Sequence, residues 1–143
     1  MRTVYNMLQA ANQLQVEALQ QDAMNKSTDT YVDLQKDQLF EGILSDGGDI
    51  VPEYSPLTKD IKRGKGQPID RVTLKDTGEF HAGIYAEPGT DGLMVDSRDS
   101  KSNMLQEKYS EEIFGLSKKN GRRSEWLEEV EDYFITGVVK VIG

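Results

Sequence analysis

The chain has no cysteine, a single histidine and no long hydrophobic run in its 143 residues. The lack of thiols excludes a disulfide framework, a cysteine nucleophile and every Cys-ligated zinc or iron–sulfur site. Apolar runs such as Phe134-Ile135 fall far short of the ~20 residues that span a bilayer. The N-terminal residues lack the basic segment and the following apolar stretch of a signal peptide. We therefore expect an intracellular protein that does not associate with membranes.

Basic residues are also scarce, because 17 Lys and Arg stand against 25 Asp and Glu and give a net charge of −8. Affinity for nucleic acid comes mainly from cations that displace counterions from phosphates, so broad wrapping of DNA is disfavoured. The mean hydropathy of −0.61 is low for a self-sufficient enzyme of this size. The length predicts one domain over residues 1–143. We expect neighbouring subunits to complete its apolar surface.

Residues 1–26 are predicted to form a helix, because they contain neither Gly nor Pro and are rich in Gln and Ala. Apolar side chains recur at spacings of four, three, three and four, which is typical of a helical stripe. These residues are Val4, Leu8, Ala11, Leu14 and Ala18. We expect the helix to bury this face. The opposite, nearly uncharged Gln-rich face suits either a subunit contact or a solvated surface.

Residues 45–71 are predicted to form one long loop, because they hold four of the 13 glycines and three of the four prolines. Loops of this length in compact domains are usually functional. Lys59, Lys62, Arg63 and Lys65 form a basic stretch within the loop, but Gln67 follows Gly66 where a Walker phosphate loop requires Lys. We expect the loop to bind a neighbouring protein and to become ordered on assembly. A solvated basic loop and weak contact with DNA phosphate remain alternatives.

The rest of the chain predicts a small sheet and a second long helix. A hairpin is expected within residues 72–97, because apolar and polar residues alternate from Phe80 to Glu87 before a turn cluster at 88–92. Apolar spacing predicts a C-terminal helix over 124–142. A short strand is expected at 31–34. These elements give an α+β fold in which a small antiparallel sheet packs against the N- and C-terminal helices.

The sequence offers little for catalysis or metal binding. His81 has Glu79 nearby, which leaves a hydrolase as the weakest of three functional hypotheses. On the predicted strand, however, His81 faces away from the apolar side chains and is expected to be exposed. Asp46 and Asp49 lack the spacing of a calcium-binding loop. We therefore expect a non-enzymatic protein without a cofactor or metal.

Two segments together carry a more specific signal. The run Tyr54-Ser55-Pro56-Leu57-Thr58 is followed by lysines and then by Val72 to Phe80, which contains Asp76-Thr77-Gly78. This order resembles the pattern aromatic-x-P-L-T, Lys, L-x-D-T-G in neck and tail-completion proteins of tailed phages. The later run 113–117, Ile-Phe-Gly-Leu-Ser, is similar to the segment before the last helix of that family.

This resemblance implies a structural protein of the virion, found in the host cytoplasm during assembly. It implies a subunit of a ring that joins the portal-bearing head to the tail, contacts portal, adaptor or tail proteins and lets DNA pass without specific binding. The residues expected to bind a partner are Tyr54, Pro56, Leu57, Thr58, Lys59, Lys62, Arg63 and Lys65. The residues expected to form a structural turn are Asp76, Thr77, Gly78 and Phe80. The alternative is a small phage or bacterial regulator or inhibitor that binds one protein through the 45–71 loop.

Overall fold

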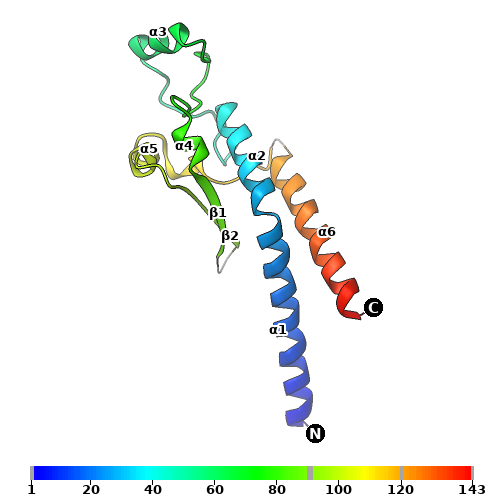
Figure 1. The fold of residues 1–143 in the computed structure, drawn as a ribbon. Coiled ribbons are helices and arrows are strands. Elements are labelled where there is room, and N and C mark those ends of the chain that lie inside the picture. Colours follow the sequence, from blue (N-terminus) through cyan, green and yellow to red (C-terminus); the bar gives the residue numbers. More distant parts are fainter. Residues whose placement is uncertain (1, 90–91, 120, 143) are drawn as a thin grey trace.

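The computed structural model describes residues 2–89, 92–119 and 121–142, and it confirms the α+β class. A two-stranded antiparallel sheet lies against the long helices at the N- and C-terminal ends (Figure 1). The elements are α1 (Arg2–Lys26), α2 (Thr28–Phe40), α3 (Pro56–Gly64), α4 (Glu79–Ala82), β1 (Ile84–Gly89), β2 (Gly92–Ser97), α5 (Ser102–Tyr109), the 3₁₀ helix η1 (Glu111–Ile113) and α6 (Arg122–Ile142).

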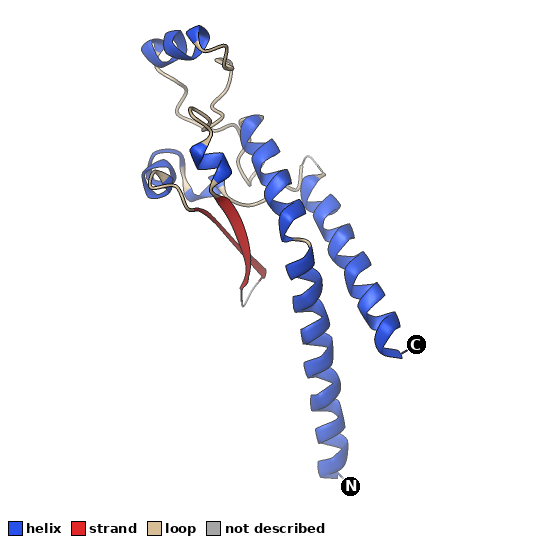
Figure 2. Cartoon of the chain, in the orientation of Figure 1, coloured by secondary structure: helices blue, strands red, loops and turns tan. Residues whose placement is uncertain are grey.

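The first two helices follow one another with a break at Ser27 (Figure 2). The Ser27 side chain is buried, and its hydroxyl donates to the carbonyls of Ala23 at 3.0 Å and Met24 at 2.9 Å. The strand expected at 31–34 is wrong, because these residues lie within α2. The buried residues of α2 recur at helical rather than alternating positions, and Tyr31 is the first of them.

The hairpin pairs β1 with β2 and matches Ile84 with Ser97 and Ala86 with Val95. The strand predicted to begin at Phe80 begins at Ile84 instead, because residues 79–82 form the short helix α4. Phe80 and His81 are both buried, although neighbouring residues of a strand point to opposite faces. Their burial therefore fits a helix that enters the core. Part of the predicted turn, residues 90–91, lies outside the described residues.

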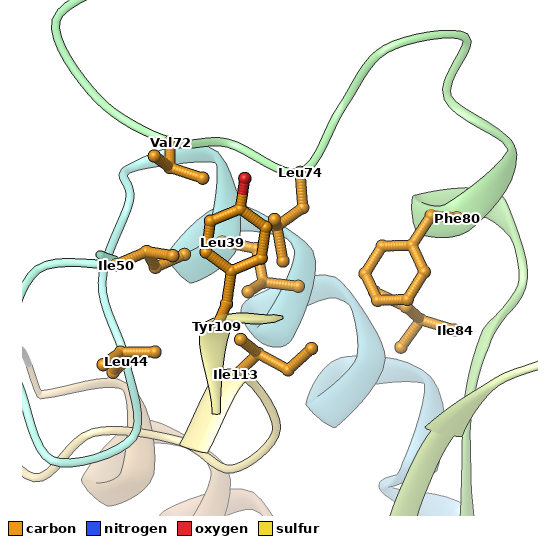
Figure 3. Packing of buried hydrophobic residues seen from close by; sticks show 9 residues of the cluster. All are labelled: Leu39, Leu44, Ile50, Val72, Leu74, Phe80, Ile84, Tyr109 and Ile113. Atoms are coloured by element: carbon orange, nitrogen blue, oxygen red, sulfur yellow. The ribbon is translucent and has the colours of Figure 1, made fainter. Parts of the chain in front are cut away.

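The main hydrophobic core gathers side chains from segments far apart in the sequence (Figure 3). Tyr109 lies among aliphatic side chains contributed by α2, by the segments that precede and follow α3, and by η1. Its members are Leu39, Leu44, Ile50, Val72, Leu74, Phe80, Ile84, Tyr109 and Ile113. The hairpin and α2 therefore form one body with the residues that lead into and out of α3.

A second cluster joins α6 to this body. The Trp126 ring meets the Tyr31 ring edge to face, with 5.1 Å between ring centroids and an interplanar angle of 83°. Leu116 completes the buried part of the cluster, and Val95 of the sheet packs against it. Burial raises the pKa of the Tyr31 hydroxyl. This cluster places the beginning of α6 beside α2 and the sheet.

Two buried glutamines of α2 fix the 113–117 segment. The Gln35 amide donates to the Ile113 carbonyl at 3.0 Å and accepts from the Gly115 N–H at 2.7 Å. The Gln38 amide donates to the Gly115 carbonyl at 2.8 Å and accepts from the Ser117 N–H at 2.8 Å. Each side-chain amide donates one hydrogen bond and accepts another, as the backbone of a neighbouring strand would. The glutamines satisfy the backbone of a segment that has no sheet partner in the described structure.

The first two thirds of α1 project beyond the body as an arm, with α6 running antiparallel along part of it (Figure 1). A 25-residue helix is roughly 37 Å long. Gly137 lets the two helices approach closely, since an added Cβ there would lie 3.0 Å from the Leu19 side chain. Among the described residues, no helix combines the length and apolar character needed to cross a membrane.

The arm leaves its apolar stripe exposed, so the expectation of a buried face is wrong for the described chain. Val4, Leu8 and Leu14 keep 57%, 60% and 66% of their surface accessible. The physical reason is that the body ends before it reaches this part of α1 (Figure 2). The outer half of α6 is similar, because Ile135, Val139 and other apolar residues there are also exposed.

Candidate partner-binding groove

The segment predicted as one long loop over 45–71 contains a helix. The loop prediction is wrong for the nine residues of α3. Ser55 caps this helix, because its hydroxyl accepts a hydrogen bond from the Thr58 N–H at 3.2 Å. Pro56 occupies the first helical turn, where its missing N–H leaves no helical hydrogen bond unmade.

A groove lies between α3, the Asp76-Thr77-Gly78 turn and α5, and it contains a cavity of about 280 Å³. It brings together many of the residues singled out in the sequence. Those that line it are Tyr54, Thr58, Lys62, Lys65, Asp76, Thr77, Gly78 and Phe80. The other predicted partner-binding residues, Pro56, Leu57, Lys59 and Arg63, are not part of its lining.

Sequence reasoning missed two of the four lysines and most of the apolar residues that line the groove. Lys75 and Lys101 add two cations to the groove, from the turn and from the start of α5. The apolar lining includes Ile61, Leu74 and Leu105. If 56–64 had been predicted as a helix, Ile61 and Lys62 would have been expected on neighbouring faces of it. Nothing in the linear sequence indicates that α5 lies opposite.

Lys62 is the buried cation of the groove, with only 6% of its surface exposed. Its ammonium group donates to the Gln67 side chain at 3.3 Å and to the Lys75 carbonyl at 3.2 Å. The ammonium also lies 4.7 Å from the centre of the Tyr54 ring, a cation–π distance. Lys62 therefore joins α3 to the segment before the turn and brings a positive charge to the wall of the groove.

Lysines dominate the electric field around Asp76. Lys65 donates to the Asp76 carboxylate at 2.8 Å across the groove. This hydrogen bond is the main reason why the pKa of Asp76 is lowered, and the charges of Lys65, Lys62 and Lys101 lower it further. The groove consequently carries four lysines against one aspartate and favours an anionic ligand.

The backbone at the floor of the groove adopts unusual conformations. Leu74 has a φ of +55°, which bulky residues seldom adopt, and Gly78 has a φ of +90°. Gly78 precedes the first residue of α4, and Phe80 of that helix enters the core. The left-handed glycine therefore turns the chain from the groove into the hydrophobic core.

We expect Gly78→Ala to lower the free energy of unfolding by about 1–2 kcal/mol, because a Cβ is disfavoured in the left-handed region. An added Cβ would meet no heavy atom closer than 3.9 Å, so the cost comes from the backbone and not from a clash. Chemical denaturation checks this value. The control is Gly64→Ala, since Gly64 has open space around it and ends a helix. Equal effects of the two variants would contradict the role assigned to the Gly78 conformation.

His81 is buried, with 6% of its surface exposed, so its predicted exposure is wrong. It lies on α4 and not on a strand, and its Nε2 atom is 2.7 Å from the Thr73 carbonyl oxygen. In the neutral tautomer with hydrogen on Nε2, the ring donates this hydrogen bond. Glu79 is exposed on the same short helix. The hydrolase hypothesis therefore gains no support from the position of the His81 ring.

Burial lowers the pKa of His81 below its usual value, against a raising effect of the Thr73 hydrogen bond; Lys75 and Lys36 lower it further. The unfolded chain binds a proton near pH 6.5, whereas the folded chain binds it only at lower pH. We therefore expect the free energy of unfolding to fall as the pH decreases from 7.5 to 5.5. Thermal denaturation of wild type and His81→Gln measures this, and the variant should lose much of the pH dependence over that interval. An identical dependence in both proteins would contradict the assignment.

Across the residues the structure describes, no group of three or more His, Asp or Glu side chains is placed to hold a metal ion. The groove and the exposed arm are the two surface features of the described residues that suit a binding partner. No family model, curated protein or solved structure matches this chain.

Proposed function

We propose that this chain is a structural virion protein of a tailed bacteriophage. It forms, with copies of itself, a neck or tail-completion ring that joins the portal-bearing head to the tail and contacts portal, adaptor or tail proteins. The proposal is supported by the sequence resemblance in the 54–80 and 113–117 segments and, above all, by the exposed apolar arm.

The arm supports the proposal most strongly, because its exposed apolar surface is unsuited to an isolated subunit. The exposed apolar residues of α1 are Val4, Tyr5, Met7, Leu8, Leu14 and Val16. Those of α6 are Leu127, Tyr133, Ile135, Val139, Val141 and Ile142. Contiguous exposed apolar surface usually marks a contact with another molecule. A projecting helix also gains most of its stability from packing, which the body does not provide here.

A ring supplies such packing repeatedly, because every subunit offers the same arm to a neighbour. The net charge of −8 suits a channel through which DNA passes, since acidic side chains in the lumen repel phosphate. The basic residues around α3 would then face protein and not DNA. In this assignment the arm forms subunit contacts and the groove receives a neighbouring protein.

Native mass spectrometry and negative-stain electron microscopy of the purified chain test the proposal. We expect a discrete species of many copies that images as closed rings. Mass spectrometry of purified virions should detect the same chain in the particle. A monomer or dimer that is absent from particles would contradict the proposal and favour the small regulator or inhibitor.

A further inference from the structure

We propose that the groove between α3 and α5 binds the acidic outer face of α6 from a second copy of this chain. This inference rests on the proposed assembly and names the two surfaces that meet within it. It follows from the charge of the groove, from the pattern on α6 and from where the two surfaces lie.

The groove combines positive charge with an apolar interior. Lys65, Lys75 and Lys101 line it together with the buried Lys62, and Asp76 is its one acidic lining residue among the residues described. Ile61, Leu74 and Leu105 contribute apolar surface beside these cations. A matching ligand therefore presents several carboxylates near an aliphatic side chain.

The outer face of α6 has this composition. Glu128, Glu131, Asp132 and Ile135 follow one another at spacings of three, one and three, which places them on one side of the helix. All four are exposed, and Ile135 keeps 51% of its surface accessible. Val139 continues the same face one turn later, at 57%. The face thus passes from acidic to apolar along the helix.

The size of the cavity fits one anchoring side chain and not a whole helix. About 280 Å³ accommodates a branched aliphatic group such as that of Ile135. The carboxylates of Glu131 and Asp132, one turn away, then lie within reach of the flexible lysine side chains at the rim. The apolar anchor supplies burial, and the charge pairs set the orientation and the choice of partner.

The position of the two surfaces makes the contact intermolecular. In Figure 1 the groove elements α3 and α5 lie on one side of α2, and α6 lies on the other. Figure 2, in the same orientation, shows the α2 helix between them. A contact between two different surfaces of identical subunits is heterologous, and such contacts generate rings when the rotation closes. The interface therefore has the geometry that a ring requires.

A charge-swap experiment tests the inference. In the groove variant, Lys75→Glu and Lys101→Glu reverse two exposed lysines; in the helix variant, Glu131→Lys and Asp132→Lys reverse two exposed acids. Lys62 is left unchanged because its side chain holds the fold together. We expect each variant alone to assemble at least about tenfold more weakly than wild type, because like charges then face one another.

An equimolar mixture of the two variants should assemble nearly as well as wild type, because each reversed groove then meets a reversed helix. The matched control is Lys108→Glu with Lys118→Glu, which changes the net charge by the same amount at two exposed positions outside the groove lining and should assemble as wild type does. Sedimentation velocity at two salt concentrations measures assembly in every sample. Circular dichroism reports whether each variant remains folded.

The outcomes separate this inference from the proposed function. If the wild-type chain assembles, and the groove variant and the helix variant each assemble equally well on their own, the groove–α6 contact is overturned and the ring proposal stands. A wild-type chain that stays monomeric overturns both. Failure of the mixture to recover, with both variants folded, also overturns the contact. Lost DNA binding by the groove variant, with its assembly unchanged, would make the groove a nucleic-acid site instead.

Discussion

Replacing Gln38 by Leu should lower the free energy of unfolding by about 3 kcal/mol, the largest effect on stability that we expect from a single substitution. The Gln38 amide is fully buried and makes two hydrogen bonds, to the Gly115 carbonyl and from the Ser117 N–H. Leu has a similar volume but leaves both backbone groups without a partner. Each buried unsatisfied group costs about 1–3 kcal/mol.

Two further variants make this expectation specific. Gln38→Met keeps a side chain of similar length but offers neither the amide donor nor its acceptor, so its stability should lie close to that of Gln38→Leu and well below wild type. Gln20→Leu makes the same chemical change on an exposed position of α1 and should alter stability by less than about 0.5 kcal/mol. Urea denaturation at one fixed protein concentration compares them. Equal stability of Gln38→Leu and Gln20→Leu would contradict the role of Gln38.

The glutamines also illustrate what the sequence could not provide. The Ile-Phe-Gly-Leu-Ser run could be singled out as a motif, but Gln35 and Gln38 carry no sign that they hold it from 77 to 80 residues away. Glutamine is usually exposed, so burial of two in one helix contradicts its average behaviour. The pairing depends on tertiary structure that brings α2 beside 113–117.

The missed helix α3 has a different explanation, because its signals were present in the sequence. Ser55 followed by Pro56 is a typical helix start, Lys62 and Arg63 suit the last turn, and Gly64 suits the end. The high density of Gly and Pro over the whole of 45–71 is typical of a loop and conceals these signals. Their positions at the two ends of a nine-residue segment carried the information.

Local patterns performed better where the chain is long and regular. Both terminal helices were predictable because their periodicity extends over many residues, and the hairpin because a cluster of turn residues lies between two short apolar runs. The burial of His81 was not predictable, because it depends on the helix α4, which replaces the start of the predicted strand. The groove was predictable in part: Tyr54, Lys62 and Lys65 were singled out, whereas Lys101 reaches it only through the fold.

The apolar stripe of α1 was also recognised, but its environment was not. A stripe on a single helix shows that the surface must be covered, and it does not reveal whether the cover comes from the same chain or from another. In the described structure Leu8 and Leu14 remain exposed. Because the stripe is not covered by its own chain, the predicted burial becomes a prediction that another subunit covers it.

Substituting Gln for both Leu8 and Leu14 should abolish assembly without unfolding the subunit. Burial of each leucine in a subunit contact is worth about 1.5–3 kcal/mol, so the double variant should weaken each contact by about a hundredfold or more. Glutamine keeps a high helix propensity and adds no charge, so α1 should retain its helix. Because both side chains are exposed in the subunit, the free energy of unfolding of the monomer should change little.

The control is Gln9→Ala with Gln20→Ala, which shortens two side chains on the Gln-rich face. Native mass spectrometry should find monomers for the leucine variant and wild-type assemblies for the control, whereas the reverse result would assign the subunit contact to the Gln-rich face.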